Sequence, residues 1–84
     1  MQKIFKYVLT NRHNTEVSLP KDSVVLHTAL QGVEICLWAR VDTDKPTEKR
    51  YFSVVGTGWD IDENMCYIGT VQEASFVWHV MEIV

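Results

Sequence analysis

The stretch that decides the fold is residues 67–83, which read YIGTVQ-EAS-FVWHVMEI. Two runs of strand-forming residues around a short polar break are typical of a β-hairpin. Alternate positions of the second run place Phe76, Trp78 and Val80 on one face, and apolar residues also occupy the other face. Both faces then need a cover, so we expect the rest of the chain to cover one and a second subunit the other. The predicted subunit interface of a homo-oligomer consists of Val77, His79, Met81 and Ile83.

Strand patterns also precede this hairpin. Residues 4–9 have the composition of a strand, residues 15–19 form a short second one after the break Asn11-Arg12-His13-Asn14, and together they predict a first hairpin that stops at Pro20. Residues 24–41 predict a second hairpin with Gln31-Gly32 as its two-residue turn. Residues 49–55 form a further strand that ends at the glycines of residues 56–58, and residues 59–64 form a loop.

The register of the second hairpin divides its residues between two faces. With Gln31-Gly32 as the turn, the core face pairs Leu26 with Leu37 and also carries Val24, Thr28, Leu30, Val33, Ile35 and Ala39. The other face is mixed in polarity: it pairs His27 with Cys36, Val25 with Trp38, and Ser23 with Arg40. Because this second face of the hairpin offers both charge and aromatic area, we expect it to contribute to binding. Trp59 and Tyr51, which stand near the loops, are expected to contribute to the same binding surface.

Composition limits the fold and the function. Eighty-four residues, 46% of them hydrophobic, make one domain over residues 1–84 with one small core. No long helical periodicity occurs, so we predict an all-β fold, with at most one short helix. The expected architecture is a small antiparallel sandwich or half-open barrel of six to seven strands built from hairpins. A net charge of −3 gives no positive field for phosphate backbones, which argues against general nucleic-acid binding.

The number of cysteines, the N-terminal run and the length of the apolar stretches bear on localisation. Two cysteines, Cys36 and Cys66, are fewer than a disulfide scaffold needs, so free thiols are expected. The N-terminal run contains lysines and no small-residue cleavage site, and no apolar stretch has the length of a membrane span. The sequence therefore favours the cytoplasm and no membrane partner.

Some of the same residues are of the types that bind metals or act in catalysis. His27, Cys36, Cys66 and His79 are zinc-ligand types, yet none of the short paired spacings of a zinc site is present. A nucleophilic Cys36 activated by His27 would also require oxyanion donors, which a flat strand surface does not provide. The aromatic residues interleaved with Arg40, Lys49 and Arg50 could stack a nucleotide base, or they could fill the core. We therefore expect no metal, no cofactor and no catalytic residue, and a small metal-dependent or Cys/His enzyme is the weakest alternative.

Several short motifs carry a resemblance across nearly the whole chain. They are IFKY (residues 4–7), LWA (37–39) with VD (41–42), TEKR (47–50), GTG (56–58), YIGTV (67–71) and FVWHV (76–80). With these motifs the chain resembles a group of short proteins of unassigned function found in tailed-phage and prophage genomes. The resemblance implies a setting, the host cytoplasm, and brings no catalytic motif with it.

Small accessory proteins of phages commonly act by binding, which gives the functional hypothesis. We expect a non-enzymatic binding protein that inhibits a host defence or a host enzyme, either by binding a host protein or by sequestering a small nucleotide signal. The alternative is a structural or assembly protein of the phage. The expected binding residues are His27, Cys36, Trp38, Arg40, Tyr51 and Trp59.

Overall fold

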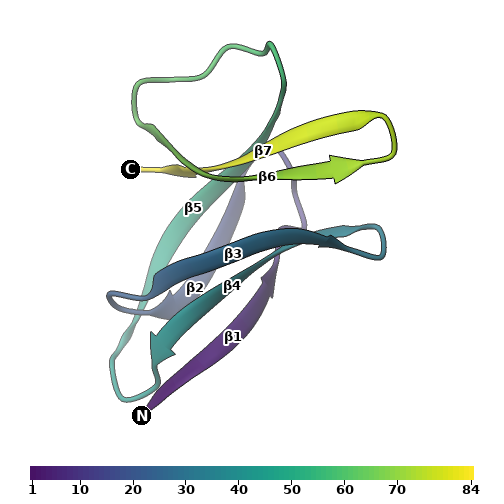
Figure 1. Cartoon of the computed structure of the whole chain (residues 1–84). Helices are drawn as coiled ribbons and strands as arrows, with labels where there is room; N and C mark the ends of the chain where they lie inside the picture. Colours follow the sequence, from purple (N-terminus) through teal and green to yellow (C-terminus); the bar gives the residue numbers. More distant parts are fainter.

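The computed structural model describes residues 1–84 and consists of strands joined by turns and loops (Figure 1). The prediction of an all-β fold is confirmed, and there is no helix. The structure therefore contains no helix with the length and apolarity needed to cross a membrane. The seven strands are β1 (Gln2–Val8), β2 (Thr15–Pro20), β3 (Val24–Gln31), β4 (Glu34–Asp42), β5 (Thr47–Gly56), β6 (Met65–Glu73) and β7 (Phe76–Ile83).

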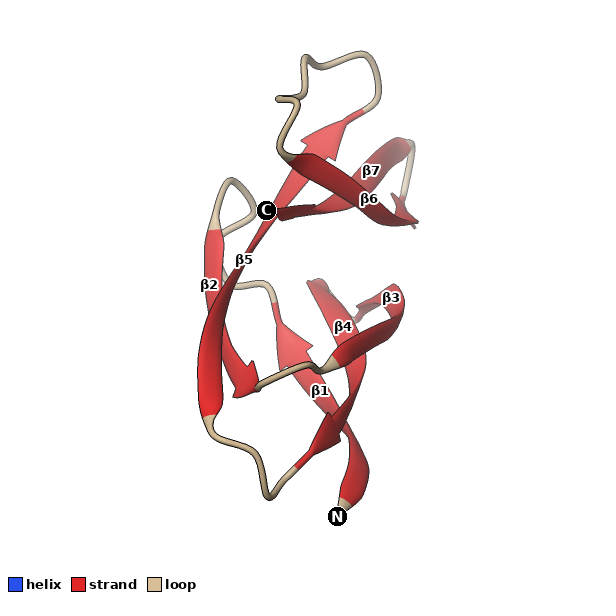
Figure 2. Cartoon of the chain, turned by 90° about the vertical axis from the view of Figure 1, so that its left-hand side faces the viewer, coloured by secondary structure: helices blue, strands red, loops and turns tan.

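The strands form two antiparallel sheets, with the orders β1-β4-β3 and β2-β5-β7-β6. Strand β5 is shared along its length: Thr47–Phe52 pairs with β2, and Tyr51–Gly56 pairs with β7. Figure 2 shows β5 running along most of the molecule, with β2 beside its lower part and β7 beside its upper part. The loop of residues 57–64 leaves the upper end of β5 and returns into β6. This stagger places the end of β5 and that loop at one end of the molecule.

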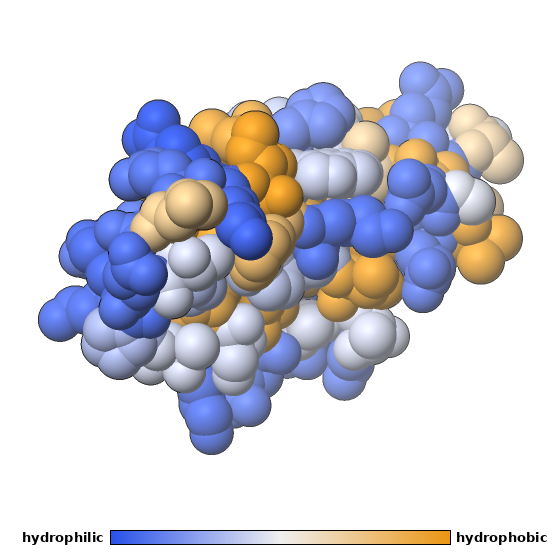
Figure 3. All heavy atoms as spheres, turned by 90° about the horizontal axis from the view of Figure 1, so that it is seen from below, coloured by the Kyte–Doolittle hydropathy of each residue, from blue (hydrophilic) through white to orange (hydrophobic).

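One core fills the space between the sheets. Its buried side chains come from both sheets, because β4 contributes alternate residues that face alternate residues of β2, β5, β6 and β7. The cluster consists of Leu9, Val17, Leu19, Ile35, Leu37, Ala39, Val41, Phe52, Val54, Val71 and Val80. Apolar side chains also reach the surface in separate patches between hydrophilic ones (Figure 3).

The predicted first hairpin is wrong. Strand β1 pairs with β4, and β2 pairs with β5 in the other sheet. The break between them carries the chain across the core, and its backbone bonds to β5: Val54 N–H donates to the Arg12 carbonyl, and Ser53 Oγ donates to the His13 carbonyl. Leu9, which follows β1, and Val17 of β2 are both buried in the core. Alternation identifies a core face but not the neighbouring strand.

The second hairpin forms, but its turn and register differ from the prediction. The turn is Gly32-Val33, and Gln31 pairs with Glu34. Of the two turn residues, only Gly32 has a positive φ, 63°, which fits the first central position of a type II′ turn. Further along β3, a bulge between Val25 and His27 shifts the register again, so Val25 faces Ala39.

The bulge reverses the predicted faces of the first half of β3. Leu26, predicted to be in the core, is 49% exposed, and Val24 is also exposed. Val25 takes their place against the core. On β4 the predicted core face is confirmed, because Ile35, Leu37 and Ala39 are buried. Strand β4, which has no bulge, thus buries the face that its sequence predicts, whereas the bulged strand β3 does so only in part.

Candidate functional site

The mixed face is the outer surface of the β1-β4-β3 sheet. The pairing β1–β4–β3 aligns Lys6, Trp38 and His27 in one row, and the rings of Trp38 and His27 lie 5.9 Å apart. The next row aligns Ile4, Arg40 and Val24. We use the name mixed face for these residues: Ile4, Lys6, Val24, His27, Trp38 and Arg40. Trp38 is half-buried and the others are exposed, so a flat surface of mixed polarity is open to solvent.

Cys36 does not contribute to this surface. It is 0% exposed, and it pairs with Ala29 instead of His27. Its thiol donates a hydrogen bond of 3.8 Å to the Glu34 carbonyl. The predicted pairing of His27 with Cys36 is wrong because the turn moved by one residue. A fully buried thiol between Val8 and Ala29 packs as a small apolar side chain.

Tyr51 and Trp59 lie away from the mixed face. Tyr51 is near the middle of β5, where its hydroxyl donates to Glu16 of β2. Trp59 follows the end of β5 in the 57–64 loop. Both belong to the four-stranded sheet or its connections, so the structure does not join them with His27, Trp38 and Arg40 into one site.

The predicted interface residues share one face of β7, as their spacing indicated. This face is covered in large part by the chain itself. Met81 is 4% exposed and lines a hollow together with Trp59 and Ile61 of the 57–64 loop. The idea that a second subunit must cover Met81 is therefore wrong. Val77, His79 and Ile83 keep some exposure on this face, and the homo-oligomer stays a prediction.

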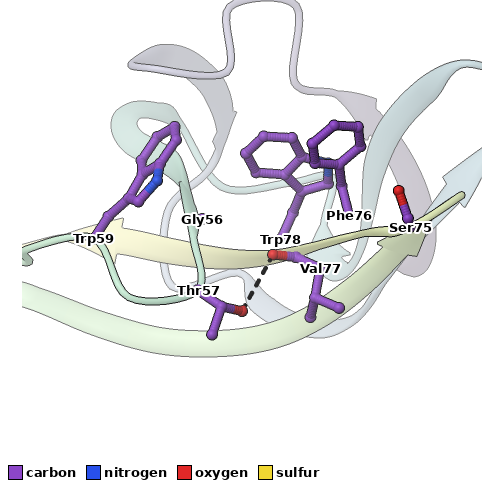
Figure 4. Close-up of a pocket in the computed structure, with 7 residues that line it drawn as sticks. All are labelled: Gly56, Thr57, Trp59, Ser75, Phe76, Val77 and Trp78. Atoms are coloured by element: carbon purple, nitrogen blue, oxygen red, sulfur yellow. Dashed lines mark hydrogen bonds between the residues drawn. The ribbon is translucent and has the colours of Figure 1, made fainter.

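A second surface of interest is the aromatic pocket at the end of β5 and β7. It has a volume of about 360 Å³ and opens to solvent. Figure 4 shows Trp59, Trp78 and Phe76 on one side of β7, with the side chains of Thr57 and Val77 on the other side. Phe76 stacks on Trp78 at 5.7 Å, and Trp59 meets Trp78 edge-on at 5.7 Å. The aromatic pocket is lined by Gly56, Thr57, Trp59, Ser75, Phe76, Val77 and Trp78.

Gly56 allows Trp59 to take its position. A Cβ at Gly56 would lie 2.8 Å from Cε2 of Trp59 and 2.9 Å from Nε1, so the indole ring occupies the space of the absent side chain. The ring is held against the strand end, although Trp59 is 53% exposed and stands in a loop. The missing side chain of Gly56, at the end of β5, therefore fixes one wall of the aromatic pocket.

Trp78 is held in place by Arg12 and Glu73. Its indole N–H donates to Glu73 Oε1 over 3.1 Å, and the guanidinium of Arg12 lies 5.6 Å from the ring centre. Arg12 also donates two hydrogen bonds to the Glu73 carboxylate, of 2.8 and 2.9 Å. A further one, of 3.3 Å, goes to the Val33 carbonyl in the β3–β4 turn. Three connections of the chain are thus joined beside Trp78.

The hydrogen bonds from Arg12, followed by that from Trp78, lower the pKa of Glu73 below its ordinary value. A carboxyl whose folded pKa is lowered stabilises the fold above its unfolded pKa, about 4.3, and loses that stabilisation as the pH falls through the folded value. Protonation also removes the charged acceptor of the Trp78 indole.

We expect tryptophan fluorescence to change in acid in the wild type, at a pH below the ordinary glutamate pKa of about 4.3, because Glu73 is protonated only when the pH falls through its lowered pKa. Glu73→Gln should abolish this acid transition and give at neutral pH an emission close to that of the acidified wild type. Steady-state emission from pH 7 to 3, with Glu63→Gln in the 57–64 loop as the control, measures both. An unchanged transition in Glu73→Gln would contradict the assignment.

His79 lies at the centre of a chain of hydrogen bonds on the opposite face of β7. Its Nε2 is 2.8 Å from Thr57 Oγ1, and its Nδ1 is 3.0 Å from Thr70 Oγ1. Thr70 Oγ1 is in turn 2.6 Å from the Tyr67 hydroxyl. Both ring nitrogens therefore have partners within the protein, which ties the start of the 57–64 loop to β6 and β7. His79 acts here as a connector of strands.

Groups of acidic, histidine or cysteine side chains that could hold a metal ion are not found in the structure. Neither the mixed face nor the aromatic pocket contains such a group. The side chains at both places can stack on rings, bury apolar area and form hydrogen bonds.

The chain was compared with known proteins. It matches, over residues 1–84, a family model described as Domain of unknown function (DUF7352). The chain belongs to this family. No curated protein and no solved structure matches it. Because the DUF7352 match covers the whole chain, both the mixed face and the aromatic pocket lie within the family domain.

Sequence reasoning named Trp59 for this DUF7352 chain but missed its neighbours in the pocket. Phe76 and Trp78 were assigned to a covered face of the last strand, and Arg12 to a polar break. These residues come together because β5 pairs with β7 only as far as Gly56 and Trp78, so the loop after β5 leaves beside the start of β7. Alternation within a strand gives no signal for that pairing.

Proposed function

We propose that this protein is a non-enzymatic binding protein that holds a protein partner by inserting an apolar side chain of the partner into the aromatic pocket. The proposed setting is the one that the sequence resemblance implies: a phage-encoded protein in the host cytoplasm that inhibits a host defence component or a host enzyme. Exposed tryptophan and phenylalanine side chains held on a rigid support are the residues that commonly dominate the energy of protein interfaces.

The observation that carries this proposal is the charge of the pocket lining. Three aromatic rings and Val77 line it, and no lysine or arginine does. Arg12, the cation beside Trp78, already has both of its terminal nitrogens bonded to Glu73. A nucleotide would need a cation for its phosphates, whereas an apolar side chain needs none. The pocket therefore supports protein binding better than nucleotide sequestration, the other mode of inhibition considered.

The mixed face adds a second contact surface to the proposal. Arg40 forms no ion pair, and Lys6 bonds only to the side chain of Gln31, so both cations are free to meet an acidic partner. Such exposed charges contribute more to the rate and specificity of association than to affinity. We therefore assign the anchoring role to the aromatic pocket and a steering role to the mixed face.

Capture of a host protein with point variants tests this proposal. We expect the tagged wild type to retain one host protein at fixed stoichiometry. Trp59→Ala and Phe76→Ala should each weaken the purified complex by about 30-fold or more, the effect of an interface hot spot. Tyr51→Ala removes an exposed aromatic ring elsewhere in the same sheet and is the matched control, which should bind as the wild type does.

Three outcomes would contradict the proposal. The first is a partner that is lost in the double variant Trp38→Ala/Arg40→Ala but kept by both pocket variants, which would place the anchor on the mixed face. The second is stabilisation by a nucleotide in a thermal scan; at about 100 times its dissociation constant a ligand adds about 2.7 kcal/mol. The third is co-purification with phage particles and no host partner, which would favour the assembly role.

A further inference from the structure

Strand β1 is a sheet edge with an unused set of backbone hydrogen-bonding groups. It pairs with β4 alone, and its other side has no neighbouring strand. Leu9 N–H donates to the Ile35 carbonyl, and Thr43 N–H donates to the Met1 carbonyl, so odd-numbered residues direct their backbone groups towards β4. Alternation then directs the backbone groups of the even-numbered residues to the free side. These residues are Gln2, Ile4, Lys6 and Val8.

The other sheet edges carry features that hinder the addition of a strand. Strands β3 and β6 each contain a bulge, and they lie against one another: a Cβ at Gly69 would be 2.6 Å from Thr28 Cγ2. Strand β2 ends in Pro20. Strand β1 has an unbroken register over seven residues and no proline. It is therefore the one edge whose geometry suits another strand.

We propose that β1 pairs with β1 of a second copy of this chain, antiparallel and centred on Phe5, so that two three-stranded sheets join into one. This proposal stands on the sheet edge and is independent of the proposed function. In this register Ile4 lies opposite Lys6 of the second copy, and Gln2 lies opposite Val8. All outward backbone groups of the strand then face a partner.

Lysines such as the two on β1 ordinarily hinder the pairing of an edge strand with another strand. Whether they do so here depends on the register. Centred on Phe5, the pairing places Lys3 opposite Tyr7 and Lys6 opposite Ile4, so no lysine meets a lysine. A pairing centred on Lys6 would place like charges directly opposite each other, which is unfavourable. The sequence of β1 thus permits the one register that also uses the whole strand.

The proposed pairing covers apolar area that the single chain leaves open. Ile4 is 63% exposed, and Phe5 is exposed although it points to the core side of the sheet. Joining the two edges would bring Ile4 beside the stem of the second copy's Lys6 and place the two Phe5 side chains at the symmetry axis. It would also make the two mixed faces continuous, so that one dimer presents two copies of Trp38 and Arg40 on the same surface.

Sedimentation equilibrium of the full chain tests the proposal. The wild type should show a mass of about twice 9.7 kDa as its concentration rises. Ile4→Lys places the new charge opposite Lys6 at two symmetry-related positions and should raise the dissociation constant about 2- to 30-fold, whereas Ile4→Glu should lower it by a similar factor. Because position 4 is exposed, neither change should alter the circular dichroism spectrum or the thermal midpoint of the single chain by more than a few degrees.

The dissociation constant should rise in Ile4→Lys and fall in Ile4→Glu, and these opposite changes are specific to this register. Added salt should bring their dissociation constants towards that of the wild type, because surface charge pairs are screened. Ile4→Thr keeps the N–H group and the strand preference, and it should dimerise. Ile4→Pro removes the N–H group on the free side and should not. A single-chain mass at every concentration up to millimolar, or a change of the same sign in the glutamate and lysine variants, would overturn the proposal.

Discussion

Leu37→Ala is expected to lower the free energy of unfolding by about 2–5 kcal/mol, the usual cost of truncating a buried leucine. Leu37 is fully buried on β4, the middle strand of its sheet, and it is part of the core between the two sheets. Its neighbours across the core come from the other sheet, so they cannot collapse into the cavity without moving the sheets together. The loss is comparable with the whole stability of a domain of this size.

Leu26→Ala is the matched control, because it makes the same chemical change on the paired strand. Leu26 lies in the bulge of β3 and is half-exposed, so its truncation should cost less than about 1 kcal/mol. Urea denaturation followed by circular dichroism gives both values, and an unchanged dependence on urea would show that the unfolded state is comparable. Equal losses in the two variants would contradict the bulged register.

The strands were predictable because each records its environment in a local pattern. Alternation on β4 identified Ile35, Leu37 and Ala39 as core residues, and the structure buries all three. The hairpin of β6 and β7 was readable from two strand-forming runs around a polar break, and the turn falls at Ala74-Ser75. These features depend only on side chains within one strand or one turn.

The pairing of distant strands was not predictable in the same way. The short break after β1 suggested a hairpin, yet β1 and β2 lie in different sheets. The choice is made by contacts between residues far apart in the sequence, such as the bond from Val54 N–H to the Arg12 carbonyl. The bulge at Leu26 is another case, since an extra residue leaves no mark in a run of consecutive apolar residues such as Val24-Val25-Leu26.

The candidate site was likewise predictable only in part. Trp38, His27 and Arg40 share a face because adjacent strands carry them, and the sequence placed them together with only the partners exchanged. The aromatic pocket depends on Trp59 folding back onto Gly56 from a loop, which follows from the close approach allowed by a missing Cβ. A glycine-containing turn indicates where the chain bends, but not which side chain occupies the space beside it.

A second large effect is expected at the ion pair between Arg50 and Glu82. The guanidinium donates to both carboxylate oxygens, over 2.6 and 2.7 Å, and also to the Ser23 carbonyl. The side chains are 19% and 17% exposed, and Arg50 lies 5.9 Å from the ring centre of Phe52. Hydrogen bonding to Glu82 raises the pKa of Arg50 further, so the arginine stays charged at every pH at which the protein folds.

Glu82→Ala should therefore lower the free energy of unfolding by about 2–4 kcal/mol, because it leaves the arginine charge in a poorly solvated position without its partner. Glu16→Ala is the control: the exposed pair of Glu16 with Lys49 spans 3.9 Å and should contribute at most about 1 kcal/mol. The double variant Arg50→Met/Glu82→Leu should recover most of the loss, since apolar side chains of similar size can replace a buried ion pair. If Glu82→Ala costs no more than Glu16→Ala in urea denaturation, water solvates the Arg50 charge. The pair would then be a surface interaction, and the seam between β5 and β7 would be held by its apolar residues alone.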